Sequence, residues 1–322
     1  CRRDFTVNSL FFNANTMSVE DFTECGLDDL EAGILRTPPP RAAREVMLED
    51  PLRALRAVRF SSSHRFDLVR EIVDAVSDPD VLQGLREKVS RERVSIEVQK
   101  IAAHESECIA RGFSLLFDCG LSQHVFADIE FTEESWSRAT RLADAAARVV
   151  GHENHALRQG AVFGAFLSEA LSQKAGDVLR RSATQGMTLS AMKRHFLAVR
   201  QHCCAIDDVM LMEGLVLSKA VRREARRIAE GVAVLHSVGQ DDLLNSPSIR
   251  YWLDSQVENL EPCLVVGLGS SEKASVALQR LHDDGHMEAV SRASILNGRD
   301  MIAKLGTKGA ETSVALTAHR QW

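Results

Sequence analysis

A carboxylate and a guanidinium three residues apart are the side chains of this sequence best suited to read a nucleic-acid base. They are Asp50 and Arg53, in the run Glu49-Asp50-Pro51-Leu52-Arg53. The carboxylate can accept a hydrogen bond from the exocyclic amino group of cytosine or adenine, and the guanidinium can donate to the ring nitrogen. Uracil and guanine present a carbonyl oxygen in place of that amino group, and an unsatisfied buried polar group costs about 1–3 kcal/mol. Such a pair could select C and A over U and G without a template.

Two further arginines continue the same run, at positions 56 and 59. Each step of three residues on a helix turns by about 300°, so Arg53, Arg56 and Arg59 spiral around its surface. One flat face cannot hold all three together with Asp50. We therefore expect the later arginines either to meet the phosphates of a ligand or to fasten the helix to a neighbouring element. On spacing alone, the commoner interpretation is an amphipathic helix with a capping aspartate and solvated arginines.

The elements before this run have mixed α/β character, over residues 1 to about 48. Asp4 is expected to cap a short helix that continues through Phe11. The alternation at 19–22 predicts a strand, which Gly26 ends. Residues 28–33 indicate one helical turn closed by glycine, and residues 34–37 indicate a second strand.

From about Asp50 onward the pattern is almost wholly helical. Asp50 is a good cap, and Pro51 suits the first turn of the helix that follows. Ser90 opens another helix, on which Arg93 and Glu97 lie four residues apart and are expected to pair. The apolar residues of that helix share one face: Val94, Val98, Ile101 and Ala102. Further helices are predicted at 136–150, 161–171, 189–212, 218–236, 271–281 and 299–305.

The composition is that of an ordinary globular protein with more than one domain: 322 residues, 45% hydrophobic and 26% charged, with a net charge of −6. This charge gives no support for nucleic-acid binding, so any RNA contact must come from a local basic surface. One candidate is the cluster Arg222, Arg223, Arg226 and Arg227, with a solvated helix face as the equal alternative. Seven cysteines without a C-x-x-C pair favour a reducing compartment over a zinc site or disulfides. No apolar run approaches the ~20 residues of a membrane span.

Four stretches, taken together and in order, resemble the tRNA nucleotidyltransferase / poly(A) polymerase family, class II, in its eukaryotic type. The chain is similar to the family's ribose-contacting, head–neck, base-reading and neck-helix motifs. These matches are Arg2 to Leu10, Gly26 to Leu30 with Gly33 to Thr37, Glu49 to Phe60, and Ser90 to Arg93 with Glu97. A weaker fifth match, Leu296 to Leu305, resembles a turn and helix in the tail of eukaryotic members.

The resemblance implies a nucleotide site. Asp50 and Arg53 would read the base of incoming CTP or ATP. Arg3 would contact the nucleotide, and Asp4 the ribose hydroxyl. Three further residues would lie on the phosphate side: Arg56, Arg59 and, as a weaker candidate, Asn8.

The same resemblance implies structural roles. Gly26 to Leu30, with Gly26 and Asp29 as its central residues, would be a hinge that changes the pocket from C to A addition. Arg93 and Glu97 would brace the neck helix. The implied fold is mainly α: a remnant of an α/β nucleotidyltransferase head at 1–48, then an all-helical neck at 49–120, body at 121–260 and tail at 261–322.

The activity that the resemblance implies is the template-independent addition of CCA to tRNA 3′ ends from CTP and ATP. The alternatives are a poly(A) polymerase or A-only-adding relative, a non-catalytic RNA-binding member of the family, and a helical scaffold without a nucleotide site. The family's Mg²⁺ ligands are expected upstream of Cys1. The chain itself would then contain no catalytic carboxylate and would be inactive alone. The implied location is intracellular: cytoplasm, mitochondria or nucleus.

Overall fold

The computed structural model of the protein describes residues 3–126, 129–150, 154–180 and 215–237, with the isolated positions 264, 266, 276, 277 and 279. The helices predicted at 189–212 and 299–305 lie outside these residues, and the one at 271–281 lies almost wholly outside them. In the described part the fold is mainly helical with four short strands, which confirms the predicted fold class. No helix in that part is long and apolar enough to cross a membrane.

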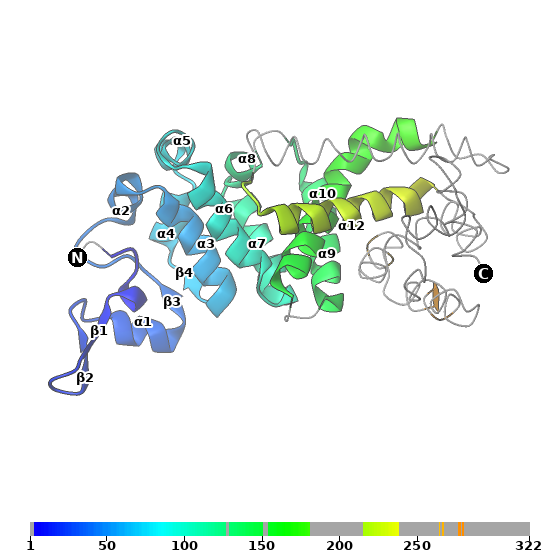
Figure 1. Ribbon diagram of the computed structural model, residues 1–322. Helices are drawn as coiled ribbons and strands as arrows, with labels where there is room; N and C mark the ends of the chain where they lie inside the picture. The colour runs from blue at the N-terminus through cyan, green and yellow to red at the C-terminus, as the bar shows by residue number, and fades with distance from the viewer. Residues whose placement is uncertain are drawn as a thin grey trace, which may run out of the picture.

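The first described residues form a small α/β unit (Figure 1). Strands β1 (Leu10–Asn13) and β2 (Ser18–Asp21) are antiparallel, with Leu10 opposite Asp21. The predicted helix from Asp4 through Phe11 is wrong, because only a 3-10 turn, η1 (Thr6–Asn8), forms there. Two aromatic residues favour the strand, and Asn13 closes the turn by accepting the N–H groups of Asn15 and Thr16 at 2.9 and 3.3 Å.

The short helix and the second strand are where the sequence predicts them. Helix α1 (Gly26–Ala32) ends at Gly33, whose φ of 68° is the left-handed conformation that glycine adopts at little cost. Strand β3 (Ile34–Leu35) follows and pairs in parallel with β4 (Asp67–Leu68). Because β4 follows α3 (Leu52–His64) in the sequence, this strand pair joins the α/β unit to the helical part of the chain.

Helices form the middle of the molecule, as predicted from about residue 50 onward (Figure 1). Helix α2 was not predicted and lies within the range assigned to the α/β head. It packs against α3, α4 and α5. The apolar face predicted for α6 is buried, since Val94, Val98, Ile101 and Ala102 are each fully inaccessible to solvent. The elements are α2 (Ala43–Glu49), α3 (Leu52–His64), α4 (Arg70–Val76), α5 (Pro79–Lys88), α6 (Arg91–Ala102), α7 (Ser106–Asp118) and α8 (Ser122–Val125).

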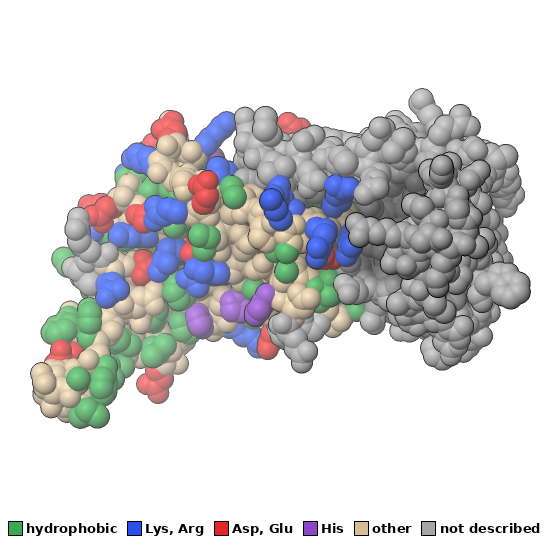
Figure 2. All heavy atoms as spheres, viewed as in Figure 1, with side chains coloured by type: hydrophobic (Ala, Val, Ile, Leu, Met, Phe, Trp, Pro, Cys, Tyr) green, Lys and Arg blue, Asp and Glu red, His purple; other side chains and the backbone are tan. Residues whose placement is uncertain are grey.

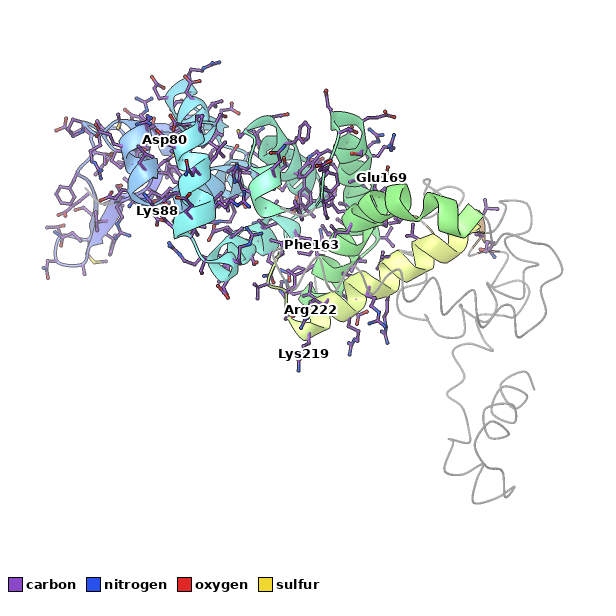
Figure 3. The ribbon with its side chains drawn as sticks, turned by 90° about the horizontal axis from the view of Figure 1, so that it is seen from above. Asp80, Lys88, Phe163, Glu169, Lys219 and Arg222 are labelled. Carbon is purple, nitrogen blue, oxygen red and sulfur yellow. The ribbon has the colours of Figure 1, made fainter. Side chains whose placement is uncertain are left out.

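Three longer helices follow: α9 (Glu133–Val149), α10 (His155–Arg180) and α12 (Lys219–Ser237). They confirm the helices predicted at 136–150, 161–171 and 218–236, although α10 is longer than predicted. Helices α10 and α12 run side by side in both views (Figures 1 and 3). An aromatic cluster joins α7, α9 and α10, in which the Trp136 Nε1–H donates to the Phe113 carbonyl at 2.9 Å.

Two glycines let α10 and α12 approach closely. A Cβ atom at Gly164 would lie 2.5 Å from the Ala225 carbonyl oxygen, and one at Gly160 would lie 2.4 Å from Glu224 Cβ. Replacing Gly164 by alanine is expected to lower the free energy of unfolding by about 1–2 kcal/mol, because a backbone atom can yield only if α12 moves. A denaturant titration measures this loss. Stability equal to or above that of the wild type would contradict this packing, and Arg141→Ala on the exposed side of α9 is the neutral control.

Apolar side chains also lie on the surface, where they cover the β1–β2 hairpin and α1 (lower left in Figure 2). The most exposed are Met17 and Phe22, each 73% exposed, and Phe12, 62% exposed. The rings of Phe11 and Phe22 contact each other edge-on, 5.8 Å apart. The apolar core lies instead among the helices.

Candidate functional site

Asp50 lies two residues before α3, and Arg53 lies in the first turn of that helix. The Asp50 Oδ1 atom accepts the Leu52 N–H at 3.3 Å, and its carbonyl oxygen accepts the Arg53 N–H at 3.0 Å. Asp50 therefore satisfies N–H groups that have no partner inside the helix, as its cap signal predicts. A carboxylate and a guanidinium thus stand on one helical turn at the junction between α2 and α3.

Helix α2 holds the guanidinium of Arg53. Its Nη1 donates to the Val46 carbonyl at 2.8 Å and contacts Glu49 Oε2 at 3.2 Å. Arg41 donates to the same Glu49 oxygen at 2.9 Å, and this hydrogen bond is the main reason why the pKa of Glu49 is lowered. The Arg53 side chain is 13% exposed, so it is largely buried in this junction.

The carboxylate of Asp50 is held from the other side, by α6. Arg93 Nη2 donates to Asp50 Oδ2 at 3.1 Å, and both side chains are partly exposed, at 50% and 31%. The predicted pair between Arg93 and Glu97 is therefore wrong. Arg93 lies on the exposed side of α6, whereas Glu97 is 3% exposed on the side that faces α3.

Glu97 braces the helices through a different arginine. Arg59 Nε donates to Glu97 Oε2 at 2.5 Å, and the two side chains are 12% and 5% exposed. Lys100 adds a contact to Glu97 Oε1 at 3.1 Å, and the Arg59 guanidinium lies 4.1 Å from the centre of the Phe60 ring. This buried ion pair joins α3 to α6, so Arg59 has a structural partner where the resemblance implied a phosphate.

Arg56 joins the helical part to the α/β unit. Its Nε and Nη2 donate to Asp4 Oδ2 at 2.7 and 2.5 Å, and Asp4 is 7% exposed. The other oxygen of Asp4 accepts the Phe5 N–H at 3.0 Å and the Asn8 side-chain amide at 3.1 Å. Three predicted site residues, Asp4, Asn8 and Arg56, are therefore in direct contact. Arg3 is exposed, with its guanidinium 5.5 Å from the centre of the Phe11 ring.

The three arginines of α3 thus reach three different partners. Arg53 contacts α2, Arg56 contacts Asp4, and Arg59 contacts α6. Of the two alternatives for the later arginines, the structure shows the contacts to neighbouring elements. The spiral of that row makes this possible, since successive members point about 60° apart around the helix.

The predicted hinge residues are tightly packed. A Cβ atom at Gly26 would lie 2.8 Å from the Thr6 carbonyl oxygen, so only glycine fits this approach. Asp29 is 3% exposed, accepts a hydrogen bond from Thr6 Oγ1 at 2.7 Å and lies 3.2 Å from Arg36 Nη2. Asp21 Oδ2 caps α1 by accepting the Gly26 N–H at 2.7 Å, and the hydrogen bond from the Thr23 side chain is the largest cause of its lowered pKa. Helix α1 is thus anchored at both its start and its middle.

The predicted RNA-binding arginines lie on α12, over which basic side chains gather in Figure 2. Figure 3 places Lys219 and Arg222 at its start. Glu224 is 4% exposed and contacts Arg223 Nε at 2.8 Å and Arg227 Nη1 at 3.5 Å. One buried carboxylate therefore offsets part of the positive charge of Arg222, Arg223, Arg226 and Arg227.

The described residues contain no candidate metal site. Within them, no group of three or more His, Cys, Asp or Glu side chains lies close enough together to hold an ion. Asp4 and Asp50, the carboxylates nearest the site, are each paired with an arginine instead. These residues do not fit a divalent metal centre.

Sequence reasoning missed the residues that orient Arg53. Glu49 lies four positions before Arg53, at a spacing that allows a helical ion pair. That signal was available in the sequence. The Val46 carbonyl and Arg41 have no such signal, because their contribution depends on where the chain turns between α2 and α3.

Parts of this chain are similar in sequence to known proteins. Residues 1–36 match the family described as the Poly A polymerase head domain. The "CCA tRNA nucleotidyltransferase, mitochondrial" of Candida glabrata is 36% identical over 149 residues, covering 44% of this chain and 27% of the relative. The Saccharomyces cerevisiae protein of the same name is 44% identical over 109 residues, covering 34% of this chain and 20% of the relative. The chain therefore spans about a quarter of the length of these relatives.

A solved structure shows the same fold. It is described as "The complex structure of CCA-adding enzyme with CTP", and its TM-score is 0.60 at 17% identity. The superposition covers 98% of this chain and 65% of the other. At this identity the likeness concerns the arrangement of the backbone.

Proposed function

We propose that this chain takes part in the template-independent addition of C, C and A to tRNA 3′ ends, because it is similar to the tRNA nucleotidyltransferase / poly(A) polymerase family. CTP and ATP are the proposed substrates, and tRNA is the proposed partner. The observation that carries this proposal is the start of α3, where Asp50 and Arg53 lie three residues apart and a separate partner orients each side chain.

Base selection follows from the hydrogen-bonding capacity of that turn. A carboxylate offers about four acceptor positions, and the described contacts of Asp50 use two of them. A guanidinium carries five N–H donors in a fixed plane, and Nη1 of Arg53 donates to Val46 and Glu49. Asp50 can therefore accept from the amino group of C or A while Arg53 donates to the ring nitrogen. U and G would bring a carbonyl oxygen against the carboxylate.

The cluster of Asp4, Asn8 and Arg56 is the proposed place for the sugar and phosphates. Asp4 is acceptor-only when ionised, so a ribose hydroxyl can donate to it, and Arg56 can meet phosphate oxygens. Arg3 lies at the exposed edge, where it can contact the nucleotide. Arg59 is proposed to support the site indirectly, by holding α3 against α6, because its Nε donates a hydrogen bond to Glu97.

The remaining assignments belong to the same proposal. Gly26 and Asp29 both contact Thr6 of η1, so α1 and η1 would move together in the proposed hinge motion. The four arginines of α12 would contact tRNA phosphates, and contacts of this kind weaken as salt concentration rises. The divisions at residues 48, 120 and 260 remain the proposed limits of head, neck, body and tail.

The metal ion and the cellular location are also part of this proposal. The family generally uses divalent metal ions, and we propose Mg²⁺ as the ion, held by residues other than those described here. An intracellular location, in the cytoplasm, mitochondria or nucleus, suits the free cysteines at 25, 108 and 119. Both yeast relatives are mitochondrial by name.

Arg53→Ala is expected to weaken the binding of CTP and ATP to the purified chain by about tenfold or more. It removes a charged donor from a largely buried position, and such hydrogen bonds contribute about 1.5–3 kcal/mol. Titration calorimetry with the four nucleoside triphosphates measures this loss. The matched control is Arg44→Ala, an arginine on α2 that pairs with Asp78 outside the site. Unchanged binding in Arg53→Ala would favour a helical scaffold without a nucleotide site.

An addition assay on the full-length gene product separates the enzymatic alternatives. The substrate is tRNA that ends at its discriminator base, incubated with CTP alone, ATP alone or both. CCA addition predicts two C residues with CTP alone, and a further A when both are present. Incorporation from ATP alone, with none from CTP alone, would instead support a poly(A) polymerase or A-only-adding protein. No incorporation, together with retained RNA binding, would support a non-catalytic role.

A further inference from the structure

The contact between Arg93 on α6 and Asp50 at the start of α3 restricts the orientation of the Asp50 carboxylate. Arg93 Nη2 lies 3.1 Å from Asp50 Oδ2, the oxygen that does not cap the helix. We propose that Arg93 is a positioning residue for base selection, which holds the Asp50 carboxylate at the angle needed to accept from an amino group. This proposal rests on the proposed function, since it concerns how the same site chooses its base.

Asp50 needs such a partner more than Arg53 does. The guanidinium of Arg53 is largely buried, and a carbonyl and a carboxylate of α2 both hold it. Among the described contacts, one side-chain oxygen of Asp50 accepts the Leu52 N–H at 3.3 Å, and the other is held by Arg93. Rotation of a carboxylate about its last torsion is only weakly restricted. Without Arg93, the oxygen that would meet the base is free to turn about a single long hydrogen bond.

Helix α6 is a firm support for this contact. Val94, Val98 and Ile101 are fully buried, and Glu97 forms the buried pair with Arg59. On the same helix, Ser95 Oγ accepts the Val216 N–H at 2.6 Å from the segment that leads into α12. The position of the Arg93 backbone is therefore set by contacts in which its side chain has no part.

Different residues of α6 hold the two helices together and position the Asp50 carboxylate. Arg59 and Glu97 carry the buried link between α3 and α6, whereas Arg93 is half-exposed and contacts the base-reading carboxylate. An exposed ion pair adds little to stability. Removing Arg93 should consequently change the choice of base and leave the melting temperature almost unchanged.

The test is the ratio of affinities for CTP and ATP over UTP and GTP, measured by calorimetry on the same chain. Arg93→Ala is expected to lower this ratio by about two- to fivefold, the range that a half-exposed charge pair supports. Arg93→Lys should recover part of it, because an ammonium can reach one oxygen but lacks the planar fork. Lys100→Ala is the matched control, since Lys100 lies on the same helix, is 48% exposed and contacts Glu97. It should leave the ratio unchanged.

A double-mutant cycle shows whether Arg93 acts through Asp50. In the Asp50→Ala background, Arg93→Ala should cause no further loss of selectivity. An equal loss in both backgrounds would overturn the proposal, as would a lowered melting temperature with an unchanged ratio. A wild-type chain that binds all four nucleotides equally would refute the proposed function itself. A selective wild type with a selective Arg93→Ala variant would refute only the role of Arg93.

Discussion

Replacing Asp50 by alanine is expected to remove most of the preference for CTP and ATP over UTP and GTP. The wild-type carboxylate faces the carbonyl of U or G with two acceptors and no proton between them, at a cost of about 1–3 kcal/mol. Because 1.36 kcal/mol corresponds to a factor of ten, selectivity should fall by about tenfold or more. Binding measurements with the four nucleotides give this ratio directly.

The asparagine variant makes the same prediction sharper. Asp50→Asn keeps the size of the side chain and adds an N–H donor, which can meet the carbonyl of U or G. UTP and GTP should therefore gain affinity in Asp50→Asn relative to Asp50→Ala. Asp74→Ala on α4 is the control, because that carboxylate pairs with Arg70 away from the site. Wild-type selectivity in both Asp50 variants would remove the base-reading role.

Replacing Arg158 by methionine is expected to lower the free energy of unfolding by about 3–5 kcal/mol. This guanidinium is 2% exposed and donates to the carbonyl oxygens of His104, Ala147 and Val150, with Nη1 2.8 Å from that of Ala147. It therefore joins the end of α9 to the chain just after α6, where the carbonyl ends of the helices favour a positive charge. Burial of this guanidinium lowers the pKa of Arg158 below its ordinary value.

The loss is to be measured as a shift in the denaturant midpoint at unchanged slope. Arg158→Lys should recover only part of it, because one ammonium cannot reach all three carbonyls. Arg148→Ala is the matched control, since that arginine is 63% exposed in a pair with Asp144 four residues away. A loss below about 1 kcal/mol in Arg158→Met would show that the buried guanidinium does not hold these helices together.

Several element boundaries could be predicted because their causes are local. Asp50 with Pro51 begins α3, Ser90 precedes α6, and Gly33 ends α1, each through chemistry within a few residues. Prediction failed at residues 10–13, where the cap at Asp4 favoured a helix. This segment is a strand because it pairs with residues 18–21, which begin eight residues later. The local pattern of polar and apolar residues does not indicate such pairing.

The candidate site was predictable as a set of residues, and its partners were not. Residue types suggested Asp50 and Arg53 as a base-reading pair, spacing alone favoured an amphipathic helix, and the resemblance supplied the site roles. The spiral of α3 left contacts to phosphates or to neighbouring elements open for its later arginines, and the structure shows contacts to neighbouring elements. The orienting groups Arg41 and Arg93 come from other elements, so no local spacing identifies them. The turn between α2 and α3 also determines how Arg53 is placed against Val46 and Glu49.

The turn that carries Asp50 and Arg53 was determined by the sequence itself, since a capping aspartate and an arginine three residues later lie at the start of the same helix wherever that helix forms. Which charges then pair was decided only by the tertiary structure. A local pair between Arg93 and Glu97 would contribute about 0.2–0.5 kcal/mol. Burial of Glu97 requires a partner that is buried with it, because an unpaired charge there costs several kcal/mol. Arg59 meets that requirement from α3, and Arg93 is left on the exposed side of α6 within reach of Asp50.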